Sequence, residues 1–111
     1  TLDRLFERAT GRPPFRVPPS WEAVKSRLDM ATRFNTSSTH DIVGGNSGSP
    51  MLDAKGNVVG LIFDGNIHSI SGSYWYDPEL NRTVSVNTQI IREAMSKVYG
   101  ADALLKELGA R

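Results

Sequence analysis

The sequence predicts a mixed β fold with flanking α-helices, in which strands fill residues 34–86 and helices lie before and after them. Two observations predict this class. Apolar residues recur at helical spacing near both ends, whereas short apolar runs separated by turn residues occupy the centre. The chain has 111 residues, of which 39% are hydrophobic, so it can bury one modest core.

Residues 1–33 are expected to form helices joined by a proline-rich connector. A short amphipathic helix is expected over 2–9, and the four prolines within 12–19 exclude a helix there. Ser20 is expected to cap a second helix that continues to about Thr32. The apolar residues that this helix would place in the core are Trp21, Val24 and Leu28.

The centre contains two patterns of strand, turn and strand. In the first, Met51-Leu52 and the run 58–63 flank a polar turn, and the continuous apolar run indicates a buried strand. In the second, 74–76 and 83–86 flank a turn, and the aromatic residues of 74–76 are expected in the core.

Residues 87–111 are expected to form a C-terminal helix that packs on the outside. Asn87 is predicted to cap it, Gly100 to end it, and residues 101–108 to resume it. The three regions, 1–33, 34–86 and 87–111, are expected to form one fragment of a larger protein.

Composition restricts the classes of partner. Thirteen basic and twelve acidic side chains give a formal charge of +1, so neither nucleic acid nor a membrane surface is an expected partner. The absence of cysteine excludes disulfides and a cysteine nucleophile. No apolar run approaches the roughly 20 residues of a membrane span. The chain starts at Thr1 without a leader pattern, so we expect it to be the interior of a longer polypeptide.

The stretch Gly44-Gly45-Asn46-Ser47-Gly48-Ser49-Pro50 is the main candidate for chemistry. A serine between glycines on a tight loop is a common way to present a nucleophile, and glycines let a substrate approach backbone N–H groups. The N–H groups of Gly45 and Ser47 would then form an oxyanion hole. The same residues are ordinary turn formers, so the pattern alone leaves a plain hairpin loop as an equal alternative.

A serine nucleophile needs a base, normally a histidine held by a carboxylate. His40 and Asp41 precede Ser47 closely, but adjacent residues on an extended segment point to opposite faces, so we do not assign them to a triad. His68 is expected to be exposed. These residues also lack the spacing of a metal site, so neither a metal nor a cofactor is predicted. The loop lacks the Lys-Ser/Thr pair and the helix of a phosphate site.

Three blocks of sequence, taken in order, resemble one family. They are Ser38-Thr39-His40-Asp41-Ile42-Val43-Gly44-Gly45-Asn46-Ser47-Gly48-Ser49-Pro50, then Gly60-Leu61-Ile62-Phe63-Asp64-Gly65-Asn66, then Asn81-Arg82-Thr83-Val84-Ser85-Val86. Together they look like the C-terminal part of the bacterial dipeptidyl-peptidases 7 and 11. The resemblance implies part of the second β-barrel of a chymotrypsin-like double-barrel serine peptidase. Such enzymes release dipeptides from peptide N-termini.

The resemblance also implies roles for four positions. Ser47 matches the nucleophile of an acyl-enzyme mechanism, and Gly45 and Ser47 match the oxyanion hole. Asp64 matches the carboxylate that binds the substrate's α-amino group. Gly65 matches the position that tunes the pocket for the residue before the scissile bond, where acidic-specific members have arginine. Glycine there implies a preference for apolar or aromatic residues.

The family's catalytic histidine and aspartate have no counterpart in these residues, so we expect this chain alone to be inactive. His40 departs from the small or amide residue expected at its position. The implied partners are peptides, and the implied location is the periplasm or the exterior of a bacterium. Exposed strand edges would allow a homodimer. A trypsin-like endopeptidase and a noncatalytic interaction module that keeps the half-barrel are the alternatives.

Overall fold

The computed structural model describes residues 1–109, which divide into two compact units. The strand unit comprises Asn35–Thr88. The helical unit comprises Thr1–Phe34 together with the segment that starts at Gln89. A strand-rich centre with helices at both ends is therefore confirmed. No helix within residues 1–109 is both long and apolar enough to cross a bilayer.

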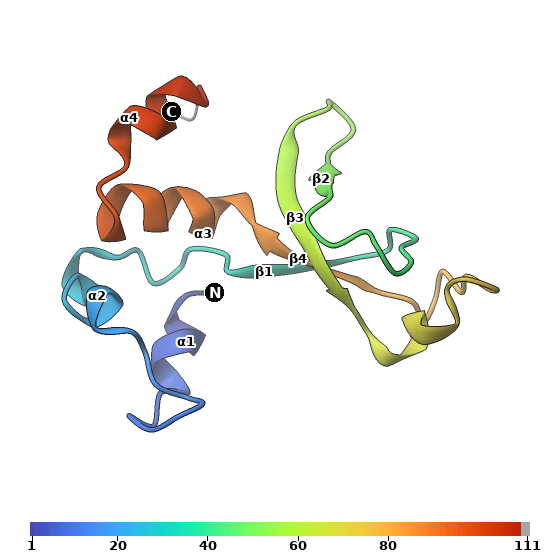
Figure 1. Cartoon of the computed structure of the whole chain (residues 1–111), viewed down its shortest axis with the longest axis horizontal. Helices are drawn as coiled ribbons and strands as arrows, with labels where there is room; N and C mark the ends of the chain where they lie inside the picture. Colours follow the sequence, from blue (N-terminus) through green and yellow to red (C-terminus); the bar gives the residue numbers. More distant parts are fainter. Residues whose placement is uncertain (110–111) are drawn as a thin grey trace. The chain divides into compact units, whose positions relative to one another are not determined.

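The strand unit is built on one four-stranded antiparallel sheet in the order β1-β4-β3-β2 (Figure 1). Its strands are β1 (Asn35–Ser38), β2 (Pro50–Leu52), β3 (Val58–Gly65) and β4 (Thr83–Asn87). The predicted hairpin of β2 and β3 and the predicted strand β4 are confirmed. Such a sheet is consistent with part of a chymotrypsin-like barrel. β1 was not predicted, because its polar sequence lacks the alternation of apolar and polar residues that indicates a strand.

The central strand β4 buries polar side chains, and each has a hydrogen-bond partner. Thr83 and Ser85 are fully buried, and Asn87 is nearly so. The Thr83 hydroxyl donates to the carbonyl of His40 over 2.7 Å, and the Asn87 amide donates to the Thr36 hydroxyl over 2.7 Å. Because buried polar groups are costly when unpaired, these bonds fix β4 in its register with β1.

The expectation that β3 is buried along its whole length is wrong. Gly60 and Ile62 are buried, whereas Leu61 and Phe63 are 39% and 45% exposed. The pairing of β3 with β4 shifts between Ile62 and Asp64, which is the signature of a β-bulge, and β3 curves visibly along its length (Figure 1). β3 therefore presents an apolar face that the described residues do not cover.

The expectation of a strand and core aromatic residues at 74–76 is also wrong. No strand forms there, and Tyr74 and Trp75 are 94% and 72% exposed. The physical reason is that β4 already has β1 on one side and β3 on the other, so the segment has no free edge of β4 to pair with. The Tyr76 hydroxyl instead donates to the carbonyl of Thr39.

The helical unit contains short helices. They are α1 (Asp3–Glu7), α2 (Pro19–Glu22), the 3₁₀ helix η1 (Lys25–Arg27), α3 (Thr88–Glu93), the π-helix η3 (Ala94–Val98) that continues α3, and α4 (Asp102–Glu107). Ile90 of α3 is buried, as expected. Gly100, with φ of +61°, ends η3, and the N–H of Ala101 donates back to the carbonyl of Met95 over 2.7 Å. The predicted helix end at Gly100 is confirmed.

The expectation that Ser20 caps a helix running to Thr32 is wrong. The helix begins at Pro19 after Pro18 and ends at Glu22. Leu28 adopts an extended conformation, and the Asp29 carboxylate accepts the N–H of Ala31 over 3.0 Å. This local bond offers the backbone an alternative to a further helical turn.

Candidate active site

A cavity of about 230 Å³ in the strand unit contains the predicted functional residues. Gly45, Ser47, Asp64 and Gly65 all line it, although the chain brings them from two separate segments. The first segment is the loop between β1 and β2, and the second is the end of β3. The structure therefore brings together every position that the sequence marked as nucleophile, oxyanion hole or substrate contact.

The serine loop leaves specific N–H groups unbonded. Over residues 45–48, bonded and unbonded groups alternate: Asn46 donates to Val43 over 3.2 Å and Gly48 to Ile62 over 2.7 Å. The N–H groups of Gly45 and Ser47 have no acceptor within residues 1–109, and the Ser47 hydroxyl is exposed and also without a partner there. Gly45 and Gly48 have φ of +99° and +86°, a backbone conformation that only glycine adopts without strain. The loop thus keeps two donors and one hydroxyl available for a bound molecule.

Two backbone hydrogen bonds join the serine loop to β3. The N–H of Gly48 donates to the carbonyl of Ile62, and the N–H of Ile62 donates to the carbonyl of Ser49 over 3.0 Å. Ile62 is buried and lies two residues before Asp64. This reciprocal pair therefore holds the segment that carries Ser47 against the segment that carries Asp64.

Asp64 presents a partly free carboxylate. Its side chain is exposed, and one oxygen accepts the N–H of Gly65 over 2.8 Å. The other oxygen has no donor among the residues that the structure describes, so it is available to a cation or an N–H group. Asp64 is the only charged side chain among the described residues that line the cavity, so the site favours a positive group near this position.

The structure adds residues to the site that the sequence did not indicate. Asn66, which precedes the 3₁₀ helix η2 (Ile67–Ser71), lines the cavity together with Ser69 and Ile70 of that helix. The Ser69 hydroxyl donates to the Asn66 side-chain oxygen over 3.0 Å. The only local signal was the three-residue spacing of Asn66 and Ser69, which is too common to identify a site.

The remaining candidates are not among the residues that line this cavity. His40, Asp41 and His68 do not line it, and the Nδ1 atom of His40 is bonded to the Ser38 hydroxyl over 2.8 Å. The cavity therefore does not bring His40 or Asp41 together with Ser47. Within residues 1–109, no cluster of three or more His, Asp or Glu side chains could hold a metal ion.

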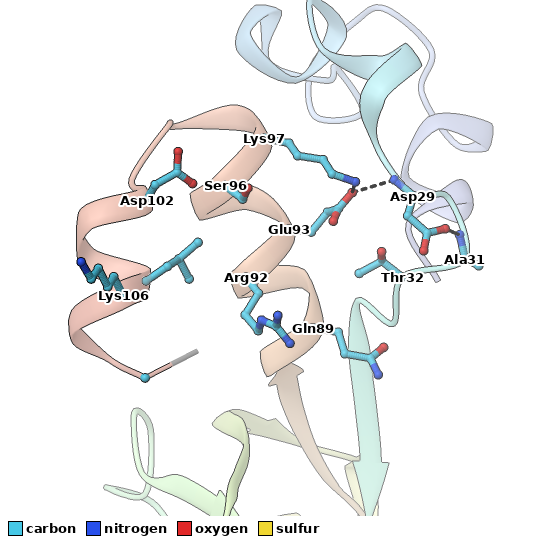
Figure 2. Close-up of a pocket in the computed structure, with 12 residues that line it drawn as sticks. Asp29, Ala31, Thr32, Gln89, Arg92, Glu93, Ser96, Lys97, Asp102 and Lys106 are labelled. Atoms are coloured by element: carbon cyan, nitrogen blue, oxygen red, sulfur yellow. Dashed lines mark hydrogen bonds and ion pairs between the residues drawn. The ribbon is translucent and has the colours of Figure 1, made fainter. Parts of the chain in front are cut away.

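A larger cavity, of about 940 Å³, lies in the helical unit and contains none of the predicted site residues (Figure 2). The side chain of Glu93, which is only 13% exposed, accepts the Lys97 ammonium over 2.7 Å and the N–H of Asp29 over 2.6 Å (Figure 2). Both donors bind the same carboxylate oxygen. Glu93 therefore connects the helix α3–η3 to the segment around Asp29. Its role is to stabilise the helical unit.

Comparison with known proteins places the chain in a family. Residues 1–110 match the model of peptidase S46. Over 117 aligned residues, the chain is 38% identical to dipeptidyl-peptidase 7 of Capnocytophaga gingivalis, with 97% of the chain aligned. It is 36% identical to the Asp/Glu-specific dipeptidyl-peptidase of Shewanella putrefaciens, with 96% of the chain aligned. In both cases it spans only 16% of the relative's length.

Comparison with solved structures points to the same family. The crystal structure of DPP11 from Porphyromonas endodontalis matches 98% of this chain with a TM-score of 0.88 and 25% identity, and the match spans 17% of the DPP11 chain. The resemblance found in the three sequence blocks is confirmed by this match and by the two peptidase relatives. The chain belongs to the peptidase S46 family.

Proposed function

We propose that this chain is the part of a serine dipeptidyl peptidase that carries the nucleophile and the amine anchor. One observation carries the proposal: Ser47, Gly45 and Asp64 line a single cavity of about 230 Å³. Within residues 1–109, the Ser47 hydroxyl and the N–H of Gly45 have no hydrogen-bond partner. An acyl transfer site needs a nucleophile and oxyanion donors together, and an exopeptidase also needs a charge that recognises a chain end.

The chemistry would proceed through an acyl-enzyme. The Ser47 hydroxyl attacks the scissile carbonyl while a base takes its proton, and the N–H groups of Gly45 and Ser47 stabilise the resulting oxyanion. The intermediate then expels the amine of the remaining peptide, which takes the proton. Water attacks the ester carbonyl in the second half of the reaction and releases the dipeptide. The base and its supporting carboxylate would come from outside these 111 residues, because neither His40 nor His68 lines the cavity.

Asp64 would select the N-terminus of the substrate. A free α-amino group is positively charged at neutral pH, and the carboxylate oxygen not bonded to Gly65 can accept its N–H groups. Fixing this amine at a set distance from Ser47 places the second peptide bond at the nucleophile. The proposal therefore explains why the product would be a dipeptide.

The proposed preference before the scissile bond is for apolar or aromatic residues. The named relatives include both an Asp/Glu-specific enzyme and dipeptidyl-peptidase 7, so family membership does not decide this point. The support comes from the cavity, whose lining has no Arg or Lys within the described residues and includes Ile42, Val43, Ile62, Phe63 and Ile70. An acidic side chain would find no cation there and would meet the charge of Asp64.

The test uses the full-length protein and its Ser47→Ala variant. Wild type should release dipeptides from peptides with a free amine, and Ser47→Ala should lose at least about a thousandfold in kcat, as loss of a nucleophile does. N-acetylated peptides of the same sequence should be cleaved far less well. Equal cleavage of acetylated and free peptides would instead identify an endopeptidase, and no difference between wild type and Ser47→Ala would identify a noncatalytic module.

Asp64→Asn sharpens this test, because it keeps the shape of the side chain and removes its charge. We expect KM for free-amine peptides to rise strongly in this variant, since the ammonium loses its counter-charge. The slow cleavage of acetylated peptides should not fall further. An unchanged preference for free amines in Asp64→Asn would show that another group anchors the N-terminus.

A further inference from the structure

Two isoleucines of η2, Ile67 and Ile70, differ in whether they line the cavity of the candidate site. Ile67 and Ile70 are 75% and 82% exposed, so the described residues bury neither. Only Ile70 lines the cavity that contains Ser47. An exposed aliphatic side chain gains free energy when a ligand covers it. Ile70 therefore has the chemistry and the location to contact a bound apolar group.

The turn that carries Ile70 is held in place by the preceding residues. The Asn66 side-chain oxygen accepts the Ser69 hydroxyl over 3.0 Å and the N–H of Arg82 over 3.1 Å. The Asn66 amide donates to the carbonyl of Leu80 over 2.6 Å, and the N–H of Ser69 donates to the carbonyl of Asn66 over 2.9 Å. These bonds fix the backbone on the N-terminal side of Ile70 to the segment that leads into β4.

On the C-terminal side of Ile70, the backbone at Gly72 lies close to the backbone at Ile42. A Cβ atom placed on Gly72 would lie 2.9 Å from the carbonyl oxygen of Ile42, which itself lines the cavity. No side chain fits in that space, so the end of η2 lies directly against the loop that leads to Ser47. Ile70 is thus held between two anchored positions, Ser69 and Gly72.

Ser69 of η2 lies directly beside Gly65, the position proposed to tune the pocket. A Cβ atom on Gly65 would lie 2.9 Å from the Cβ atom of Ser69 and 3.1 Å from its hydroxyl oxygen. The space beside Gly65 is therefore filled by η2 and not by a side chain of β3. A substrate side chain that reaches Gly65 meets η2 there.

We propose that Ile70 is a specificity-determining residue, whose side chain contacts the substrate residue before the scissile bond. This inference rests on the proposed function of Ser47. Ile70 supplies apolar contact area in a pocket where Gly65 supplies none. It would favour leucine or phenylalanine over alanine in the substrate, because larger apolar side chains cover more of it.

The matched pair Ile70→Ala and Ile67→Ala tests the inference in the full-length protein. The substrates are dipeptide aminocoumarins with a free amine and Leu, Phe or Ala before the scissile bond. We expect Ile70→Ala to lower the ratio of kcat/KM for Leu over Ala by about tenfold, the usual scale for lost contacts of this size. Ile67→Ala should leave the ratio as in wild type. An unchanged ratio in Ile70→Ala, or an equal change in both variants, would overturn the inference.

Ile70→Lys adds a gain of function that a folding defect cannot imitate. A cation at this position should raise the ratio of kcat/KM for Glu over Leu substrates by at least tenfold, whereas Ile67→Lys should not. Equal ratios in the two lysine variants would count against Ile70 as a pocket residue. Thermal unfolding of each variant shows whether it is folded at the assay temperature.

Acetylated substrates separate failure of the inference from failure of the proposed function. If wild type cleaves acetylated and free peptides equally, the dipeptidyl activity is overturned, while the Leu/Ala ratio in Ile70→Ala still decides the role of Ile70. If wild type cleaves none of them, both proposals are overturned. If wild type acts as proposed and only the Ile70 variants behave like wild type, the inference alone fails.

Discussion

Ser69 occupies the space that any side chain at Gly65 would need, since the Cβ atoms of the two positions would be 2.9 Å apart. The φ angle of Gly65 does not require glycine, because Gly65 is not among the residues with positive φ. Glycine is therefore required at this position by its neighbour and not by its own backbone.

The first prediction concerns this steric pair in the full-length peptidase. Gly65→Ala should lower kcat/KM for Leu substrates by about tenfold, because overpacking costs ~1–3 kcal/mol and moves η2. Adding Ser69→Gly should restore most of the activity. Adding Ser69→Ala, which loses the same hydroxyl bond but keeps the Cβ atom, should not. Equal rescue by both second substitutions would argue against the steric explanation.

The second prediction concerns the chain as a fragment. A fluorophosphonate probe should label Ser47 in the full-length protein but only very slowly in the 111-residue chain, because an unassisted serine lacks a base. Mass spectrometry of the labelled peptide identifies the site, and Ser47→Ala provides the background. Labelling of the fragment at the full-length rate would contradict the idea that the base lies outside it.

The third prediction concerns the β2–β3 turn and pH. The Asn57 side-chain amide, which donates to Asp53 over 2.8 Å, lowers the pKa of Asp53, and the N–H groups of Asn57 and Lys55 lower it further. A carboxyl whose pKa is lower in the folded state stabilises the fold above its unfolded pKa. That stabilisation is lost as the pH falls through the folded pKa. NMR titration should therefore find that Asn57→Ala raises the pKa of Asp53, and an unchanged pKa would contradict the assigned cause.

The fourth prediction concerns Glu93. Replacing it by alanine leaves the N–H of Asp29 and the Lys97 ammonium without their acceptor, and loss of such a partly buried acceptor costs ~1–3 kcal/mol. Amide exchange at Asp29 should accelerate, and thermal unfolding should shift to lower temperature. Glu7→Ala is the control, because the Arg4–Glu7 pair is 68% and 60% exposed and its loss should change neither measurement detectably.

The fifth prediction concerns the end of η3. Gly100→Ala places a Cβ atom on a residue with φ of +61°, and this strain costs ~1 kcal/mol. Open space surrounds the position, so no clash with a neighbour adds to the cost. Gly100→Asn should lose less, because asparagine tolerates the left-handed conformation better. Equal unfolding temperatures for the two variants would contradict this.

Local patterns predicted the parts of the fold whose determinants are local. The β2–β3 hairpin depends on its own turn residues, and the helix end depends on Gly100, so both were predicted correctly. The segment 74–76 has strand composition, but whether it pairs depends on the edges of β4, which β1 and β3 already occupy. The helix that begins at Pro19 ends at Glu22, and further along the N–H of Asp29 donates to Glu93, a contact between distant parts of the chain that no local pattern reports.

The residues of the candidate site also differ in whether the local sequence could predict them. Ser47 and Gly45 were indicated by a short motif, whereas Asp64 and Gly65 were indicated only by the family resemblance. Ser69 and Ile70 were not predicted, because they reach the cavity from the helix η2, which lies against Gly65 and Ile42 in space. No spacing along the chain reports such an approach.

The two hydrogen bonds that Ile62 exchanges with Gly48 and Ser49 have a consequence for how the enzyme family can diverge. They use only main-chain atoms, so in the proposed enzyme they would hold the Ser47 loop against the Asp64 segment whichever side chains surround the cavity. In the proposed enzyme, substitutions could then change which side chain is preferred before the scissile bond without changing the length of the product. New substrates could be acquired by changing position 70, or position 65 together with Ser69, while the cut stays after the second residue.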